Sequence, residues 1–194
     1  MRILAGAYKG RRLLSPPLQA GVRPITGSVK KSLFGMLGRR LPDAVVVDLY
    51  CGTGTMGLEA LSQGGRRCCF ADSNRAVLAK LRRNMEALSV TDRCVVWQGD
   101  VERRFAGWLD ELSGAVDVAF VDPPYALAAA WSWPRVVRRI FDPLAWHLAD
   151  DGVVVLRLPR KVAPPDPLGK LAVQRTRQYG GMVLALLGLS EESE

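Results

Sequence analysis

Four residues, Asp122, Pro123, Pro124 and Tyr125, follow an apolar run at 116–121 that is typical of a buried strand. The Asp122 carboxylate and the Pro123 carbonyl can both accept hydrogen bonds from an exocyclic amino group, and the fixed φ angles of the two prolines hold these acceptors in place. Tyr125 offers an aromatic face on which a base can stack. A proline-rich turn that merely ends a strand is the alternative interpretation. The surrounding residues decide between the two.

A glycine-rich segment follows an earlier valine-rich strand and contains Asp48, Tyr50, Gly52 and Gly54. The two glycines let the backbone approach a ligand closely at the start of a helix. With Gly57 they also satisfy the G-x-G-x-x-G pattern of dinucleotide-binding proteins, which alone is a weak signal. The carboxylate of Asp48 would lie near a pyrophosphate that needs no further negative charge, whereas it suits a ligand with an ammonium and a sulfonium. The segment therefore predicts S-adenosylmethionine.

Further acidic residues follow the next strands of the chain. Asp72, with Ser73 beside it, ends the second expected strand, and Asp100 follows the third. A carboxylate at Asp72 can accept from both ribose hydroxyls, and Asp100 can accept from the adenine amino group while the Val101 N–H faces the ring. With the two acids above, these residues place a carboxylate at the end of four successive strands. In a doubly wound sheet that edge forms one continuous crevice.

Strands and helices alternate along most of the chain, which predicts an α/β fold with a doubly wound, mostly parallel sheet. Ser73 can cap the second helix. Two final strand-like runs flank Tyr179, Gly180 and Gly181 and predict a C-terminal antiparallel hairpin, giving seven strands. The expected strands are 44–49, 68–71, 94–97, 116–121, 153–158, 170–178 and 182–187, and the expected helices are 55–63, 73–89, 101–112 and 135–148.

Positive charge is concentrated at the start of the chain. The net charge is +8, yet residues 1–42 hold nine Lys or Arg residues and no Asp or Glu. This imbalance indicates a polyanionic partner such as RNA. We predict a basic N-terminal extension at 1–42, made of a β-hairpin and a helix, a methyltransferase domain at 43–190 and a frayed tail at 191–194. The predicted RNA-binding residues are Arg11, Arg12, Arg23, Lys30 and Lys31.

Composition narrows the class of protein. The 194 residues are 48% hydrophobic, which excludes a disordered chain, and no apolar run approaches the ~20 residues that span a bilayer. The first residues lack the apolar region of a secretory signal, so we expect a cytoplasmic protein, and we predict a monomer. Four cysteines without C-x-x-C spacing and a single histidine predict no metal site. Trp131, Trp133 and Trp146 could border the substrate, but we expect Trp146 in the core.

The motifs resemble the class I methyltransferases, and the start of the chain is similar to the RsmD family, the small-subunit rRNA guanine-N2 methyltransferases. The resemblance covers nearly the whole chain. It rests on Met1-Arg2-Ile3-Leu4-Ala5-Gly6, Lys9-Gly10-Arg11-Arg12-Leu13, Arg23-Pro24-Ile25-Thr26, Val29-Lys30, Ser32-Leu33-Phe34, residues 48–61, residues 122–125 and Arg177-Gln178-Tyr179-Gly180.

The resemblance implies a Rossmann-like enzyme that converts S-adenosylmethionine to S-adenosylhomocysteine, without a metal, while methylating guanine N2 in 16S rRNA. The substrate would be rRNA within the small subunit or an assembly intermediate. The segment around Thr26 would lie near the methionine part of the cofactor. The sequence departs from the family pattern at Gly27, Ser28 and Lys31, where the family usually has Asp, Arg and an acidic residue. Asp72 stands where the family more often has Glu.

Two other functions remain open at this point. The same four residues serve adenine N6 in DNA methyltransferases, although no separate DNA-recognition domain is visible in the chain. A non-catalytic RNA-binding or ribosome-assembly protein could retain the fold, although the intact set of acids weighs against it. From the residues alone, guanine and adenine are equally acceptable.

Overall fold

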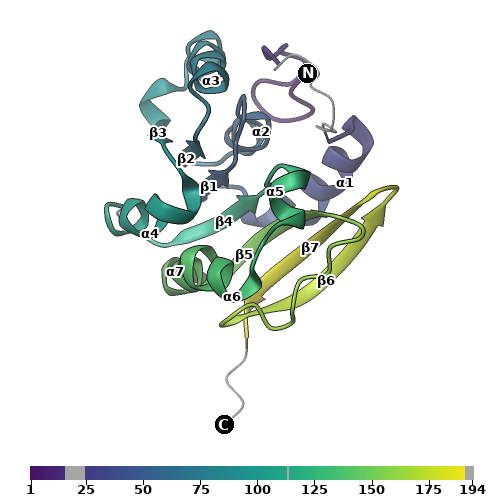
Figure 1. The fold of residues 1–194 in the computed structure, drawn as a ribbon. Helices are drawn as coiled ribbons and strands as arrows, with labels where there is room; N and C mark the ends of the chain where they lie inside the picture. Colours follow the sequence, from purple (N-terminus) through teal and green to yellow (C-terminus); the bar gives the residue numbers. More distant parts are fainter. Residues whose placement is uncertain (16–24, 113, 191–194) are drawn as a thin grey trace.

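A seven-stranded sheet forms the centre of the protein (Figure 1). The computed structural model describes residues 1–15, 25–112 and 114–190. The strand order is β3-β2-β1-β4-β5-β7-β6, with β7 antiparallel to both of its neighbours and the other pairs parallel. This topology confirms the predicted fold and the C-terminal hairpin. The strands are β1 Val45–Leu49, β2 Arg67–Asp72, β3 Cys94–Gln98, β4 Val116–Val121, β5 Leu148–Pro159, β6 Leu171–Tyr179 and β7 Met182–Leu189.

Helices cover both faces of the sheet, as the two buried apolar clusters show. The N-terminal segment, α1 (Gly27–Leu37), α2 (Thr55–Ser62) and α3 (Arg75–Leu88) pack on one face. The other face carries α4 (Val101–Asp110), α6 (Trp133–Val136), the π-helix η3 (Val137–Phe141) and α7 (Asp142–His147). Cys68 and Cys69 illustrate the alternation, because each joins a different cluster. The short elements are η1 (Gly38–Arg40), η2 (Thr91–Arg93) and α5 (Tyr125–Ala129).

The start of the chain folds back on itself. Ile3 N donates to the Arg11 carbonyl at 3.0 Å, and Arg2 and Arg12 form an antiparallel bridge. The Leu4 and Ala5 N–H groups donate to the Glu59 carboxylate of α2 at 2.9 Å, which attaches this turn to α2. The described part of residues 1–42 thus contains a small bridged turn and α1.

Two helices differ from the sequence-based expectations. The cap of α3 is Asn74 rather than Ser73, since Asn74 Oδ1 accepts from Ala76 N at 2.9 Å. The single helix expected at 135–148 is divided into α6, η3 and α7. Pro143 in the first turn of α7 has no N–H to donate, so the regular helical ladder cannot continue through it.

Trp146 was expected in the core, and this prediction is wrong. The residue is 73% exposed, because Leu144 and Ala145 occupy the buried side of α7. Its ring lies 4.4 Å from the Lys170 ammonium. Arg23 and the tail at 191–194 lie outside the described residues. No helix in the described ranges combines the length and the apolar character needed to cross a membrane.

Candidate active site

The four predicted acids lie at the same edge of the sheet. Asp48 is the last residue but one of β1, Asp72 ends β2, Asp100 follows β3 and Asp122 directly follows β4. The register aligns these ends, because Leu49 of β1 lies opposite Ala71 on one side and Val121 on the other. The carboxyl ends of β1 to β4 therefore lie together at one edge of the sheet, where the sequence predicted the crevice.

The glycine-rich segment turns sharply between β1 and α2. Gly52 and Gly54 have φ angles of 56° and 80°, which glycine adopts at little cost. A side chain at Gly54 would meet Leu81 at 2.4 Å, so this glycine allows close packing. A side chain at Gly52 would meet nothing within 4 Å, so this backbone faces open space. Two acids hold the turn: Asp48 Oδ2 accepts from Gly57 N, and Asp72 Oδ2 from Gly52 N, both at 2.9 Å.

The electrostatics of this turn suit a cationic ligand. Burial raises the pKa of Asp48 to about 7, and the nearby Asp122 and Asp72 carboxylates raise it as well. A positive charge placed over Asp48 would therefore be favourable. The Tyr50 hydroxyl is buried, and no described residue is its hydrogen-bond partner. A buried acid with a raised pKa and a buried hydroxyl without a described partner both fit a polar, positively charged ligand.

The remaining predicted cofactor residues have structural roles in the present geometry. Asp72 Oδ1 accepts from Asn74 N at 2.8 Å, next to the exposed Ser73. Asp100 caps α4 by accepting from Arg103 N at 3.3 Å. The Val101 N–H is the first of this helix and therefore has no intrahelical acceptor. Thr26 caps α1 through Val29 N at 3.4 Å. These contacts leave carboxylate and hydroxyl lone pairs available.

The Asp-Pro-Pro-Tyr segment leaves β4 and starts α5. Asp122 N donates to the Leu49 carbonyl at 3.4 Å, which keeps the segment beside β1. Pro123 is buried, and among the described residues no backbone N–H donates to its carbonyl. The Tyr125 hydroxyl is buried, also without a described partner. The segment therefore combines the Asp122 carboxylate and the Pro123 carbonyl, unpaired among the described residues, with a tyrosine ring that packs against the apolar cluster.

Arg157 is the residue that sequence reasoning missed. It lies in β5, which pairs with β4, and its Nε donates to Asp122 Oδ1 at 2.6 Å. Its Cζ atom lies 5.5 Å from the centre of the Tyr125 ring. One signal was available: Arg157 is the only charged residue in the apolar run 153–158.

The predicted RNA-binding residues do not form one group. Lys30 is a correction, since it is 1% exposed and its Nζ lies 2.7 Å from Glu59 Oε2. It falls on the buried face of α1, whereas Lys31 is exposed. The Arg11 guanidinium donates to the Ala87 carbonyl at the end of α3, and Arg12 is exposed. Arg12 and Lys31 therefore remain available to a polyanion without rearrangement.

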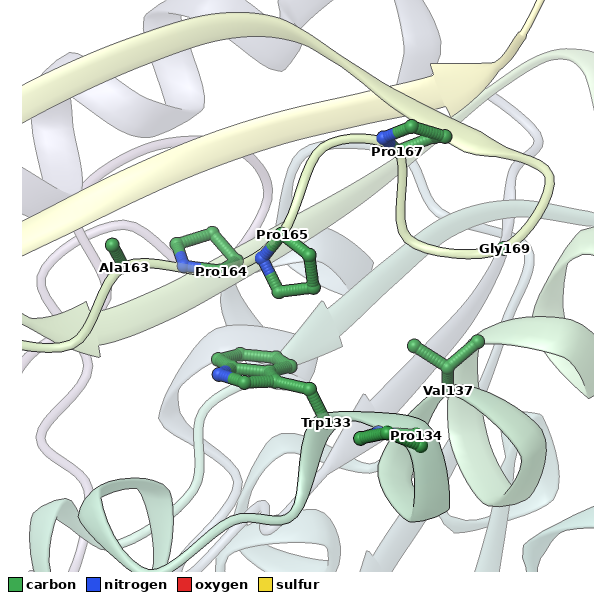
Figure 2. Close-up of a pocket in the computed structure, with 8 residues that line it drawn as sticks. All are labelled: Trp133, Pro134, Val137, Ala163, Pro164, Pro165, Pro167 and Gly169. Carbon is green, nitrogen blue, oxygen red and sulfur yellow. The ribbon is translucent and has the colours of Figure 1, made fainter.

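A shallow apolar groove lies elsewhere, between α6 and the loop after β5 (Figure 2). Trp133 faces Pro164 and Pro165 there, with Val137 and Pro167 farther along. The lining residues include no titratable side chain, so the groove offers no acid or base chemistry. In the described ranges no group of three or more His, Cys, Asp or Glu side chains could hold a metal ion.

Sequence comparisons relate nearly the whole chain to known proteins. The family model described as Conserved hypothetical protein 95 matches residues 1–188. YlbH of Bacillus subtilis is 31% identical over 180 residues, which are 93% of this chain and 94% of YlbH. Ribosomal RNA small subunit methyltransferase D of Escherichia coli is 32% identical over 125 residues, which are 64% of this chain and 60% of that protein.

Solved structures show the same fold along the chain. The yhhF protein of Escherichia coli superposes with a TM-score of 0.79 at 25% identity, covering 98% of both chains. A Thermus thermophilus protein superposes with a TM-score of 0.78, also at 25% identity, covering 97% of this chain and 99% of that one. This chain belongs to the Conserved hypothetical protein 95 family, which is the RsmD family of methyltransferases that its motifs resemble.

Proposed function

We propose that this protein transfers a methyl group from S-adenosylmethionine to the exocyclic N2 amino group of a guanine in 16S rRNA of the small subunit. The observation that carries the proposal is the pair of acceptors at the crevice, the Asp122 carboxylate and the Pro123 carbonyl, beside the Tyr125 ring. The choice of RNA is supported by the relative named as a ribosomal RNA small subunit methyltransferase.

The cofactor would bind along the edge formed by β1 to β3. Asp48 would attract its positive charge, and Gly52 and Gly54 would let the backbone approach it. Asp72 would accept from the ribose hydroxyls, with Asp100 and the Val101 N–H at the adenine. Tyr50, Ser73 and Thr26 complete the proposed set. When bound, the cofactor supplies an electrophilic methyl group on a positively charged sulfur.

The residues of the motif would activate the amino group. The lone pair of guanine N2 is delocalised into the ring, so this nitrogen is a poor nucleophile. Acceptance of its two N–H bonds by Asp122 and the Pro123 carbonyl favours a more pyramidal nitrogen and holds it in line with the donor. Tyr125 would stack on the base after it leaves its helix or loop. Alignment and electrostatics account for most of the acceleration.

After transfer the methylated nitrogen carries an acidic proton. Asp122 Oδ2 is the nearest candidate acceptor on the motif, because Oδ1 is engaged by Arg157. Asp122 would take this proton directly or pass it to water. The exposed Arg12 and Lys31 would contact phosphates that flank the target and would set affinity rather than sequence preference. We propose that the enzyme acts in the cytoplasm as a monomer, on rRNA in the small subunit or an assembly intermediate.

A single experiment tests the proposal. Labelled S-adenosylmethionine is supplied with deproteinised rRNA, isolated small subunits or duplex DNA, and the labelled nucleoside is identified after digestion. We expect N2-methylguanosine from rRNA or subunits alone. N6-methyladenine in DNA would replace this proposal with the DNA methyltransferase alternative. Absence of transfer to every substrate, with tight RNA binding, would instead indicate a binding or assembly protein.

A further inference from the structure

Arg157 interrupts an otherwise apolar strand. The other residues of the run 153–158 are Val or Leu, and they are all buried. Arg157 is itself 8% exposed. Burial removes most of the hydration of a guanidinium, which is unfavourable unless other groups accept its hydrogen bonds or balance its charge. The partners of Arg157 therefore indicate its role.

These partners both belong to the Asp-Pro-Pro-Tyr motif. Nε lies 2.6 Å from Asp122 Oδ1, and the guanidinium carbon lies 5.5 Å from the centre of the Tyr125 ring. The Asp122 side chain retains 24% exposure, so it still faces the crevice. Arg157 thus contacts the carboxylate and the ring that the proposed reaction uses, and it approaches them from β5.

One part of the guanidinium has no protein partner. Nη1 is buried, and no described residue accepts a hydrogen bond from it. An unsatisfied buried donor destabilises the folded protein, and an apolar residue like its neighbours in β5 would avoid that cost. The arrangement is therefore poor as a device for stability alone. It is well suited to a site where an incoming ligand supplies the missing acceptor.

We propose that Arg157 is a positioning residue for methyl transfer: it fixes Asp122 through Oδ1, maintains it as a carboxylate and leaves Oδ2 for the amino group. Nη1 would donate to N3 of the bound guanine, the ring nitrogen beside the amino-bearing carbon that carries no hydrogen. The inference rests on the proposed function and adds a residue to the same site.

The charged and titratable groups around Asp122 set the expected pH dependence. Arg157 faces it from β5 and Asp48 from β1, while Tyr125 on α5 contributes its ring. Burial raises the pKa of Asp122, and Arg157 opposes this by charge and hydrogen bonding. Removing Arg157 therefore raises this pKa further. Asp122 would then become protonated at a higher pH and would stop accepting from the amino group.

The experiment is a pH profile of kcat at saturating cofactor and RNA. The titration of Asp48 affects cofactor affinity. At saturating cofactor, kcat does not depend on that affinity, so the kcat profile does not report on Asp48. For Arg157→Gln we expect the acidic limb to move to higher pH, with a loss of tenfold or more on the acidic side of the wild-type profile that diminishes as the pH rises. Arg157→Lys keeps the charge, so its limb moves less, while KM for RNA rises because the second donor is removed.

Arg66→Gln is the matched control, because Arg66 pairs with Asp43 at 3.7 Å on the surface and away from the crevice. Its profile should coincide with that of the wild type. A second readout does not depend on activity: the ¹³C carboxyl signal of Asp122, assigned with Asp122→Asn, should titrate at higher pH in Arg157→Gln.

The outcomes separate the two proposals. A wild-type enzyme that transfers no methyl group to rRNA would overturn the proposed function, whereas the carboxyl titration would still test the pairing. If the wild type is active and the limb and the carboxyl titration are unmoved in both Arg157 variants, Arg157 has only a structural role. Unchanged cofactor affinity in these variants checks that the fold is intact.

Discussion

Two buried ion pairs of this protein differ in what surrounds them. Lys30 and Glu59 lie 2.7 Å apart, with side chains 2% and 0% exposed. Arg157 and Asp122 lie 2.6 Å apart, with side chains 10% and 24% exposed. Glu59 also accepts from Leu4 N, Ala5 N and Gln63 Nε2. The first carboxylate is saturated by protein donors, whereas the second still faces the crevice.

We infer from this difference that the Lys30–Glu59 pair stabilises the fold, whereas the Arg157–Asp122 pair can also contact a substrate. A saturated, fully buried carboxylate has no lone pair for a ligand, so the Lys30–Glu59 pair attaches the N-terminal turn and α1 to α2. Asp122 keeps one oxygen available. One member of each pair acts on Asp48, since Lys30 lowers its pKa and Asp122 raises it. The variants below affect the two pairs differently.

The largest expected effect is on the pair at the crevice. Asp122→Ala removes an acceptor of the amino group, and we expect methyl transfer to fall by roughly 10²- to 10⁴-fold. Cofactor affinity should be retained, since we propose that Asp122 contacts the target base rather than the cofactor. Single-turnover transfer and calorimetric titration of the cofactor measure the two quantities. Asp110→Ala, at an exposed acid, is the control. Loss of cofactor binding would mean that Asp122 has another role.

The next effect is on stability. Lys30→Met leaves Glu59 buried without its countercharge, so we expect the free energy of unfolding to fall by about 3–5 kcal/mol. Arg157→Met should cost less, because Asp122 can still reach water. Urea denaturation of both variants makes the comparison. Equal losses would show that the two pairs do not differ in the way proposed.

Asp48 gives a pH dependence. Its pKa is about 7 in the folded protein and 3.8 in the unfolded one, so its contribution to stability is present at low pH and is lost as the pH rises toward 7. A cationic cofactor needs the charged form, so cofactor affinity should rise across the same interval by roughly tenfold per unit below the pKa. Asp48→Asn should flatten both profiles. Denaturation and calorimetry at several pH values measure the stability and the cofactor affinity. If both still depend on pH in Asp48→Asn, another group is responsible for the pH dependence.

The smallest effect concerns RNA. Lys31→Glu and Arg12→Glu should each weaken RNA binding severalfold and reduce the salt slope by about 0.7–0.9 for each phosphate interaction that the substitution removes. Lys30→Met should leave the slope unchanged, since Lys30 is buried. Fluorescence anisotropy at several salt concentrations measures this. Arg138→Glu, an exposed residue of η3, is the control. Identical slopes in all variants would remove Arg12 and Lys31 from the proposed RNA surface.

Strands and acids at strand ends were predictable, because both depend on local patterns. The run 116–121 matches β4, and the predicted hairpin matches β6 and β7. Element boundaries were less predictable. Asn74 rather than Ser73 caps α3, and Pro143 divides a helix whose apolar spacing looked continuous. At α3 two neighbouring residues could cap the same backbone, and at Pro143 a missing N–H interrupts the helical hydrogen bonds; the spacing of apolar residues shows neither effect.

The sequence by itself determined the fold class, the order of the motifs and the residue types available for the chemistry, because these depend on periodicity, glycine and proline geometry and charge count. Only the tertiary structure decided which charges are accessible. Lys30 and Lys31 are adjacent and chemically alike, yet one is buried against Glu59 and the other is exposed. Arg157 and Asp122 are 35 residues apart and meet only because β5 pairs with β4. Pairing between distant segments has no local signal, and it decides the partners of every buried charge.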